Sequence, residues 1–539
     1  MRLITGLLLS PLAGLISVAS ASKYGYNHVT VIRDSDKVVE GAFPDVNFDI
    51  VSPDFMHPDR RQPGFSNGTQ GPTSWFHINT TDSFIQSLAS PDKNMKFGNA
   101  NFRSEERQGY PYVHVSKANA TSPKIRIWIQ ASVHGNEPAG EEAAMAILGK
   151  LSTNKTWADS VLDKVELFFL PRYNPDGVFY FQRALATNLD PNRDHTKLER
   201  QVSRDIKQLF SDFNPHIAID MHEYSAFTEF GDGAYVHGSD GLFAAAKNLN
   251  IRGEIRNLSE ELFAKNIARD MEAAGLRTEP YVTGRSSSYQ DVGYVAEFSE
   301  AGSDARIGRN AMGLTQTVSF LLETRGIGLA DQEYGRRTAS GFTMCGSIIQ
   351  TAVDNADRVL ETIEAGIDAF VNSSNPIVVT DHGTVDTRPF TMVDKNNGTV
   401  VKMPVRFEST TPTIANLTRT RPEAYLIPIA WDDIAKRLHA SGVEVENLKQ
   451  PWEGTVEALT IESAILDTSY YEGSVLTTTT TTAAERHVRL PAGSFLVSTR
   501  QKNAGLAMVA LEPEGIDSYV TFNIIPVEKG DEYPIFRVM

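Results

Sequence analysis

The stretch Ile125-Arg-Ile-Trp-Ile-Gln-Ala-Ser-Val-His-Gly-Asn-Glu-Pro-Ala-Gly140 decides how this chain folds, because an apolar strand pattern in it leads into a helix. Residues 125–130 alternate β-branched and aromatic side chains, and residues 141–151 have the alanine, leucine and glutamate content of a helix. His134 and Glu137 therefore lie at a strand-to-helix turn, where α/β proteins place their chemistry. An imidazole and a carboxylate at this spacing can bind one Zn²⁺, although the same pattern also occurs by chance in surface turns.

The composition is that of a large globular protein. The chain has 539 residues, of which 41% are hydrophobic, so it can bury a substantial core divided between two or three domains. Its formal net charge of −16 offers no basic surface for a polyanion. We therefore expect no nucleic-acid partner and no binding to anionic membranes.

Residues 1–21 have the pattern of a cleavable signal peptide, because one cation precedes an apolar run that ends in Ala19-Ser-Ala21. No later run is long and apolar enough to span a membrane. We therefore expect a secreted, extracellular protein with N-linked glycans at some of its sequons. The sequons begin at Asn67, Asn79, Asn119, Asn154, Asn257, Asn372, Asn397 and Asn416. The single cysteine, Cys345, cannot form a disulfide within the chain, and we expect it to be buried on a helix.

The remaining sequence divides into three parts. Residues 22–70 are rich in Pro, Asp and Gly, which predicts an irregular arm, with a removable propeptide as the alternative. Residues 71–374 alternate strand and helix patterns, which predicts an α/β catalytic domain with a mixed, mostly parallel sheet and helices on both faces. Residues 375–539 predict a smaller β-rich C-terminal accessory domain. Within it, the threonine run 477–482 fits either a linker or an edge strand.

Five short polar motifs follow strand patterns in the α/β part, and we expect each of them at or just after the end of a strand. They are His134-x-x-Glu137, Asn174-Pro-Asp-Gly177, Asp190-Pro-Asn-Arg-Asp194, Asp220-Met-His222 and Leu322-Glu-Thr-Arg-Gly326. In order, spacing and residue types, they resemble the zinc carboxypeptidases of the carboxypeptidase A type, the M14 metallopeptidase family. The resemblance covers roughly residues 95–330.

The resemblance implies a metal site and a catalytic base. His134, Glu137 and His222 match the family's ligands for a single Zn²⁺, which would keep a net positive charge and one open position. Glu323 matches the family's catalytic glutamate, which takes a proton from water and passes it to the leaving amine. From the residues alone, His222 could also be a buried core histidine, and Glu323 could be a strand-end carboxylate paired with Arg325.

The resemblance also implies residues that bind substrate. Asn192 and Arg193 match the family's clamp for a terminal carboxylate, because a planar guanidinium can hold both carboxylate oxygens. Asp190 matches the carboxylate that orients a metal-binding histidine, and a cap for the turn is its alternative role. Arg183 is a candidate for stabilising the oxyanion, and a solvated surface arginine is the alternative.

The sequence leaves the details of the substrate site open. The tyrosine that closes over substrate in this family could be Tyr289 or Tyr294, and Arg306 and Arg309 would suit an acidic C-terminal residue if they face the site. The leading hypothesis is a secreted zinc carboxypeptidase acting on a peptide or small amide that has a free carboxylate. A zinc amidohydrolase on N-acyl amino acids or other small amides is the alternative, and a non-catalytic binding protein that keeps the metal site is a third hypothesis.

Overall fold

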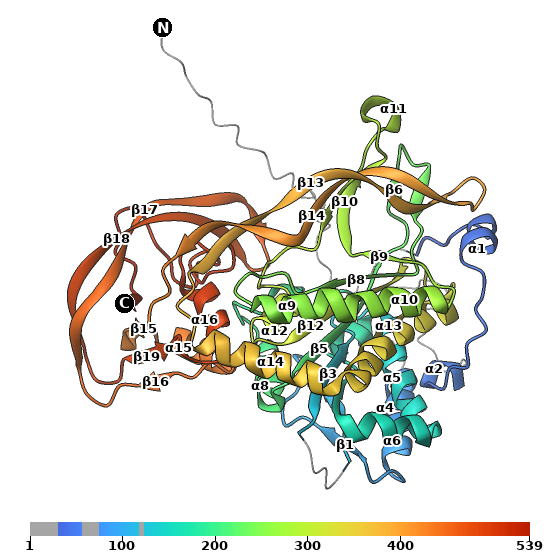
Figure 1. The fold of residues 1–539 in the computed structure, drawn as a ribbon, viewed down its shortest axis with the longest axis horizontal. Helices are drawn as coiled ribbons and strands as arrows, with labels where there is room; N and C mark the ends of the chain where they lie inside the picture. Colours follow the sequence, from blue (N-terminus) through green and yellow to red (C-terminus); the bar gives the residue numbers. More distant parts are fainter. Residues whose placement is uncertain (1–30, 57–74, 118–122) are drawn as a thin grey trace.

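The computed structural model describes residues 31–56, 75–117 and 123–539 of the chain. The predicted signal peptide, residues 1–21, lies outside these ranges, as do the sequons at Asn67 and Asn119. The described residues form three sheets with helices packed around them (Figure 1).

A mixed eight-stranded sheet forms the centre of the α/β part (Figure 1). In spatial order, its strands are β1 (Met95–Asn99), β2 (Pro111–Val115), β4 (Val165–Leu170), β3 (Ile125–Ala131), β5 (Ile217–Ser225), β12 (Val318–Ile327), β8 (Gly241–Ala245) and β9 (Thr278–Pro280). The run β4-β3-β5-β12 is parallel throughout, whereas β2 and β8 pair antiparallel with its two outer strands. The predicted fold class is therefore confirmed.

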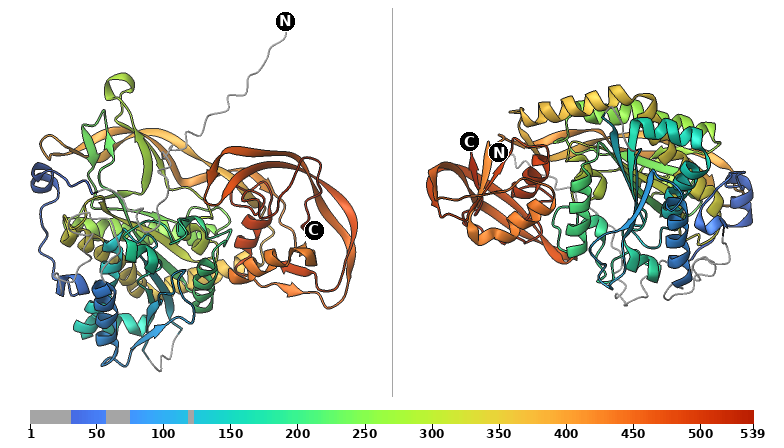
Figure 2. Two further views of the ribbon diagram at one scale, coloured as in Figure 1. Left: turned by 180° about the vertical axis from the view of Figure 1, so that it is seen from behind. Right: turned by 90° about the horizontal axis from the view of Figure 1, so that it is seen from below.

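Helices cover both faces of this sheet (Figure 2). Those of the described residues up to 371 are α1 (Asp36–Ala42), α2 (Pro53–Met56), α4 (Trp75–Ala89), α5 (Pro138–Thr153), α6 (Lys155–Lys164), α7 (Pro175–Tyr180), α8 (Gln201–Phe213), α9 (Gly253–Leu258), α10 (Lys265–Ala273), α11 (Tyr289–Val292), α12 (Gly308–Gly313), α13 (Tyr334–Asp354) and α14 (Ala356–Val371). A π-helical turn, Ser259–Ala264, joins α9 to α10, so these three elements follow one another without a break.

The alternation of side chains in β3 explains the two covered faces. Ile127 and Ile129 belong to the core cluster that includes residues of α5 and α13, whereas Trp128 points to the opposite face. There the Trp128 ring stacks on Phe168 and meets Phe210 of α8 edge-on, with ring centroids 4.9 and 5.5 Å apart. A strand in the middle of a parallel sheet is buried on both sides, so both sets of side chains are apolar.

Strands β5 and β12 continue past their predicted ends at Asp220 and Glu323, to Ser225 and Ile327. The expectation that every motif lies at or just after a strand end is therefore wrong for His222 and Glu323, which lie inside strands. It is also wrong for the motif at 190–194, which follows the helix Pro175–Tyr180 and a turn. In β5 and β12, the apolar pattern stops early because the polar residues beyond it are buried with polar partners, as in the ion pair of Glu223 with Arg337. Backbone pairing between the two strands continues regardless of side-chain polarity.

A second, six-stranded sheet crosses the predicted domain boundary at 374/375. Its strands, in order, are β10 (Val282–Ser286), β11 (Ala296–Glu300), β14 (Val400–Arg419), β13 (Ile377–Asp394), β7 (Tyr235–His237) and β6 (Glu229–Phe230). The long hairpin of β13 and β14 runs from the C-terminal part across the α/β part and pairs with β7 and β11 there (Figure 1). The division into a catalytic and an accessory domain stays a prediction, and this hairpin belongs physically to both sides of it.

The third sheet lies in the C-terminal part, at the far side of the molecule from α1 (Figures 1 and 2). Its strands, in order, are β16 (Glu446–Asn447), β19 (Phe495–Ser498), β15 (Ala424–Ile427), β20 (Phe536–Val538), β17 (Trp452–Tyr471) and β18 (Ser474–Leu490), accompanied by helices α15 (Asp432–Ala440) and α16 (Ala504–Leu511). The threonine run 477–482 lies in β18, at the edge of the sheet. Of the two alternatives for this run, the edge strand is therefore confirmed.

The described part of the predicted arm, residues 31–56, packs onto the α/β part. It contains the two short helices α1 and α2, so the arm is less irregular than expected. Phe43 is buried, and both carboxylate oxygens of Asp34 accept from Arg325 of β12, at 2.5 and 3.1 Å. Because Arg325 is itself buried, the arm contributes to the core of the fold.

The surface of the described residues agrees with several expectations. The asparagines of the six sequons in these ranges are exposed, namely Asn79, Asn154, Asn257, Asn372, Asn397 and Asn416. Cys345 is buried in α13, as predicted. None of the helices in the described ranges combines the length and the apolar character needed to cross a membrane.

We expect Asp34→Ala to lower the free energy of unfolding by about 2 kcal/mol, because the buried guanidinium of Arg325 then loses two charged hydrogen bonds and keeps only the longer ion pair with Glu333. Urea denaturation of the purified protein measures this change. Asp36→Ala is the matched control, because Asp36 is an exposed residue of the same arm, and its effect should stay within about 0.5 kcal/mol. Equal stabilities of the two variants would show that the arm is dispensable for the fold.

Candidate metal centre and active site

The turn between β3 and α5 positions His134 and Glu137. Glu137 directly precedes α5, and its backbone N–H donates to His134 O at 3.2 Å. A Cβ atom at position 135 would lie 1.8 Å from the backbone of Gly177, so Gly135 is needed for this close approach. The motif at residues 174–177 therefore packs against the turn of His134 and Glu137. Asn174 Oδ1 fixes this motif by accepting from Gly177 N at 2.8 Å.

Strand pairing brings His222 and Glu323 together. The parallel register of β5 and β12 places the two residues directly opposite each other. Met221 and Leu322, their neighbours in sequence, point into the core cluster that includes residues of α5 and α13, so His222 and Glu323 share the other face of the sheet. Because β5 also pairs with β3, His222 lies beside the turn that carries His134.

Three potential metal ligands converge at this place. Glu137 Oε1 lies 2.7 Å from His134 Nδ1, Glu137 Oε2 lies 2.9 Å from His222 Nδ1, and the two Nδ1 atoms are 3.1 Å apart. All three side chains are buried. Residues that are 88 positions apart in sequence thus place their ligating atoms around one point.

The surroundings of the imidazoles indicate which nitrogens are free for a metal. His134 Nε2 lies 3.0 Å from Asp190 Oδ1, and His222 Nε2 lies 3.0 Å from Asp220 Oδ1, the latter at an angle outside hydrogen-bond geometry. Each Nε2 is therefore assigned the hydrogen, and each Nδ1 presents a lone pair to the same point as Glu137. These groups repel one another unless a cation lies between them. Ligands of a tetrahedral zinc ion are about 3.3 Å apart, so the donor set fits zinc.

Asp190 connects this centre to the neighbouring turn. Besides facing His134, its Oδ1 accepts the backbone N–H of Asn192 at 2.8 Å, and its Oδ2 accepts from Arg183 Nη2 at 2.8 Å. Both alternatives considered for Asp190, the orientation of a histidine and the capping of a turn, are therefore present in the geometry at once.

Glu323 is buried beside the candidate ligands and lacks a compensating cation of its own. Its Oε2 has no hydrogen-bond partner among the described residues. Burial raises the pKa of Glu323 to about 8, against the opposing effect of His222. A divalent cation nearby would lower this pKa again. Arg325, considered as the partner of Glu323, instead forms ion pairs with Asp34 and Glu333.

Two arginines flank Asp190 at the edge of the site. Arg183 Nη1 lies 3.2 Å from His134 Nδ1, so its guanidinium faces the candidate ligands although the side chain is 40% exposed. Arg193 Nη1 donates to Asn192 O at 2.9 Å and lies 4.0 Å from Asp190 Oδ2. Asn192 Oδ1 accepts from the backbone N–H at position 308, which leaves its amide nitrogen as a donor. The structure thus brings all the predicted site residues into one region.

A third tyrosine, besides the two considered, interacts electrostatically with these charges. Tyr289 is half exposed on α11, which projects from the molecule (Figure 1), and the hydroxyl of Tyr294 points to Glu297. Tyr281, between β9 and β10, is half-buried, and burial followed by the charge of Glu323 raises its pKa, with Arg193 and Arg183 acting in the opposite direction. Sequence reasoning missed Tyr281 because no motif surrounds it.

Arg306 and Arg309 differ from each other in surroundings. Arg306 Nε donates to Asp517 of the C-terminal part at 2.5 Å, and its guanidinium lies over the Tyr471 ring. Arg309 is fully buried and donates to the carbonyl oxygen of Gly302.

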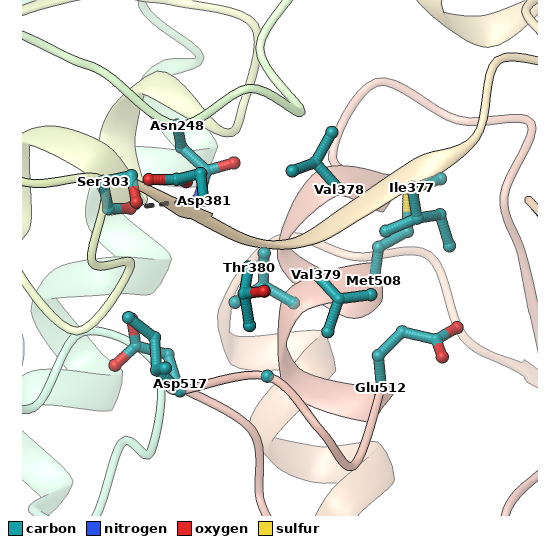
Figure 3. A pocket seen from close by; sticks show the side chains of 13 residues that line it. Asn248, Ser303, Ile377, Val378, Val379, Thr380, Asp381, Met508, Glu512 and Asp517 are labelled. Carbon is teal, nitrogen blue, oxygen red and sulfur yellow. Dashed lines mark hydrogen bonds between the residues drawn. The ribbon is translucent and has the colours of Figure 1, made fainter. Parts of the chain in front are cut away.

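A cavity of about 60 Å³ lies away from these residues, between β13, α16 and the loop that follows α16 (Figure 3). Ile377, Thr380, Asp381 and Met508 are among its lining residues, and none of the three candidate ligands is. We assign no role to it.

Comparison with known proteins agrees with this geometry. The zinc carboxypeptidase profile, Peptidase_M14, matches residues 101–235. Carboxypeptidase 2 of Trichophyton equinum is 53% identical over 96% of both chains, and carboxypeptidase 2 of Trichophyton rubrum is 52% identical over 96% of both chains. The solved structure of a metallo-carboxypeptidase from Burkholderia cenocepacia aligns with a TM-score of 0.39 and 15% identity, over 52% of this chain and 69% of that one. At such identity to full-length relatives, this chain belongs to the zinc carboxypeptidase family, Peptidase_M14.

Proposed function

We propose that this zinc carboxypeptidase holds one zinc ion per chain with His134, Glu137 and His222, and releases single C-terminal amino acids with Glu323 as general base. One observation supports this most directly: two imidazole lone pairs and one carboxylate converge next to buried Glu323, whose Oε2 has no hydrogen-bond partner among the described residues. Zinc bound there would supply positive charge that polarises the scissile carbonyl and acidifies water. Proton transfer and substrate binding would be carried out by side chains of the protein.

Glu323 can accept a proton and return it. Its Oε2 makes no hydrogen bond within the described residues, so it is available to a water molecule at the centre. Desolvation makes this carboxylate a stronger base than a surface glutamate. Once protonated, Glu323 can donate the same proton to the amine that leaves.

Arg193, Asn192 and Arg183 are suited to the negative charges of the substrate. Arg193 and the amide of Asn192 lie on the turn next to Asp190, where they can hold the two oxygens of a terminal carboxylate. Arg183, which faces the candidate ligands, can stabilise the oxyanion that forms on the carbonyl. Tyr281, beside the same charges, is the tyrosine best placed to contact the substrate.

The wider predictions are compatible with this assignment. The relatives are named as carboxypeptidases, which favours the carboxypeptidase hypothesis over the amidohydrolase alternative. The presence of Glu323 beside the ligands disfavours a non-catalytic binder. Secretion and glycosylation remain predictions, supported by the exposure of the six sequon asparagines in the described ranges.

We expect the purified protein to bind one zinc ion per chain and His222→Ala to bind at least about a hundredfold more weakly, because two remaining ligands hold zinc poorly. Competition with a chromogenic chelator, together with metal analysis, measures both quantities. His487→Ala is the control, because His487 is an exposed histidine of the C-terminal part. Equal zinc affinity in the two variants would refute the ligand assignment.

We expect Glu323→Gln to lower kcat by at least about a thousandfold while zinc content stays at one per chain, because glutamine has the same shape and cannot accept the proton. Steady-state hydrolysis of a peptide with a free carboxylate measures this loss. Glu485→Gln is the control, because Glu485 is an exposed glutamate. Glu223, by contrast, is buried in an ion pair with Arg337. Full activity of Glu323→Gln would exclude Glu323 as the base.

We expect a peptide amide to be cleaved at least about a hundredfold more slowly than the same peptide with a free carboxylate, because the charged hydrogen bonds to the terminal group are lost. Arg193→Ala should remove most of this discrimination by raising KM for the free acid alone. Comparison of kcat/KM for the acid and the amide, in both proteins, provides the measurement. Equal rates for acid and amide in the native protein would favour the amidohydrolase.

A further inference from the structure

The turn that carries Asp190, Asn192 and Arg193 is held on its outer side by the C-terminal part. The tip of the β17–β18 hairpin reaches it, and Glu472 Oε2 accepts the backbone N–H of Asp190 at 2.8 Å. A Cβ atom at position 473 would lie 3.8 Å from Leu189, the residue before the turn. A contact thus joins residues 282 positions apart in sequence.

The backbone at the hairpin tip is unusual for the residue it carries. Tyr471 pairs with Ser474, so Glu472 and Gly473 form a two-residue loop, with φ of 43° and 91°. Loops of this kind favour asparagine or glycine at the first position, because other side chains are strained at positive φ. A glutamate there is maintained at a conformational cost, which is typical of positions with a functional role.

Further contacts fix the tip against the same segment. The ammonium group of buried Lys197 donates to Glu472 O. Next to Glu472, the ring of Tyr471 lies 5.2 Å from the Arg306 guanidinium. The hairpin is therefore docked from both sides of Glu472, and its side chain is held at the Asp190 amide.

A displacement of Asp190 would also move the residues proposed to bind the substrate. Its carboxylate holds Arg183 and the backbone of Asn192, so these groups move together. We propose that Glu472 is a positioning residue of this enzyme, through which the C-terminal part holds the turn of Asn192 and Arg193 in the arrangement that binds the substrate carboxylate. This inference rests on the proposed function of that turn.

Three substitutions of Glu472 separate hydrogen bonding from charge. Glu472→Gln keeps the length and an acceptor oxygen, Glu472→Asp keeps the charge but withdraws the oxygen, and Glu472→Ala removes both. In the Asp and Ala variants, we expect KM for a free-carboxylate peptide to rise about tenfold, and Ki for the released amino acid to rise by the same factor. This is the effect of one lost charged hydrogen bond, and kcat should stay within about twofold. The Gln variant should stay within about threefold of the native protein. Glu462→Ala, an exposed glutamate of the same hairpin, is the control.

Hydrogen–deuterium exchange of the peptide covering residues 190–198 gives a readout that needs no activity. We expect the Asp and Ala variants to exchange about tenfold faster there, and the Gln variant to match the native protein. Unchanged exchange and KM in the Asp and Ala variants would overturn the proposal, as would an equal loss in the Gln variant. If the Ala variant does not fold, the Asp and Gln pair decides. Inactivity of the native protein on peptides would refute the proposed function, while exchange would still decide whether Glu472 positions the turn.

Discussion

The pairing of β5 between β3 and β12 is the constraint on which the site depends. It places His222 opposite Glu323 on one side and next to the turn of His134 on the other. A slip by one residue would turn His222 to the opposite face of the sheet, so the register must be fixed strongly. The apolar side chains of these strands fix it, because they fill the cores on both faces. The hydrophobic core and the catalytic geometry are therefore set by the same pairing.

This constraint gathers groups that repel one another. The centre contains buried carboxylates at positions 137, 190, 220 and 323. Arg183 faces them, but its side chain is 40% exposed, so it compensates their charge only in part. Isolated burial of such charges costs several kcal/mol each, so the fold tolerates them only with compensation. A divalent cation among the ligands provides it, which couples zinc binding to the stability of the native state.

Much of the fold and most of the site could be predicted from the sequence, because the relevant signals are local. The strand before His134, the helix after Glu137 and the motif at Asp190 each lie within a few residues. What could not be predicted depends on distant partners. Asp220 and Glu323 looked like strand ends because their neighbours are polar, yet those neighbours are paired with residues such as Arg337. Tyr281 has no local motif, and its electrostatic interaction with Glu323 depends on where β9 and β10 place it.

Two of the connections between the C-terminal part and the α/β part differ in character. The β13–β14 hairpin completes a sheet with β7 and β11, and the β17–β18 hairpin contacts the turn that contains Asp190. The first connection buries apolar side chains such as Phe390 against Phe298, which accounts for stability. The second is made of polar contacts to a turn that already has its own internal hydrogen bonds. Stability alone does not explain a glutamate at positive φ at that tip, which agrees with the positioning role proposed for Glu472.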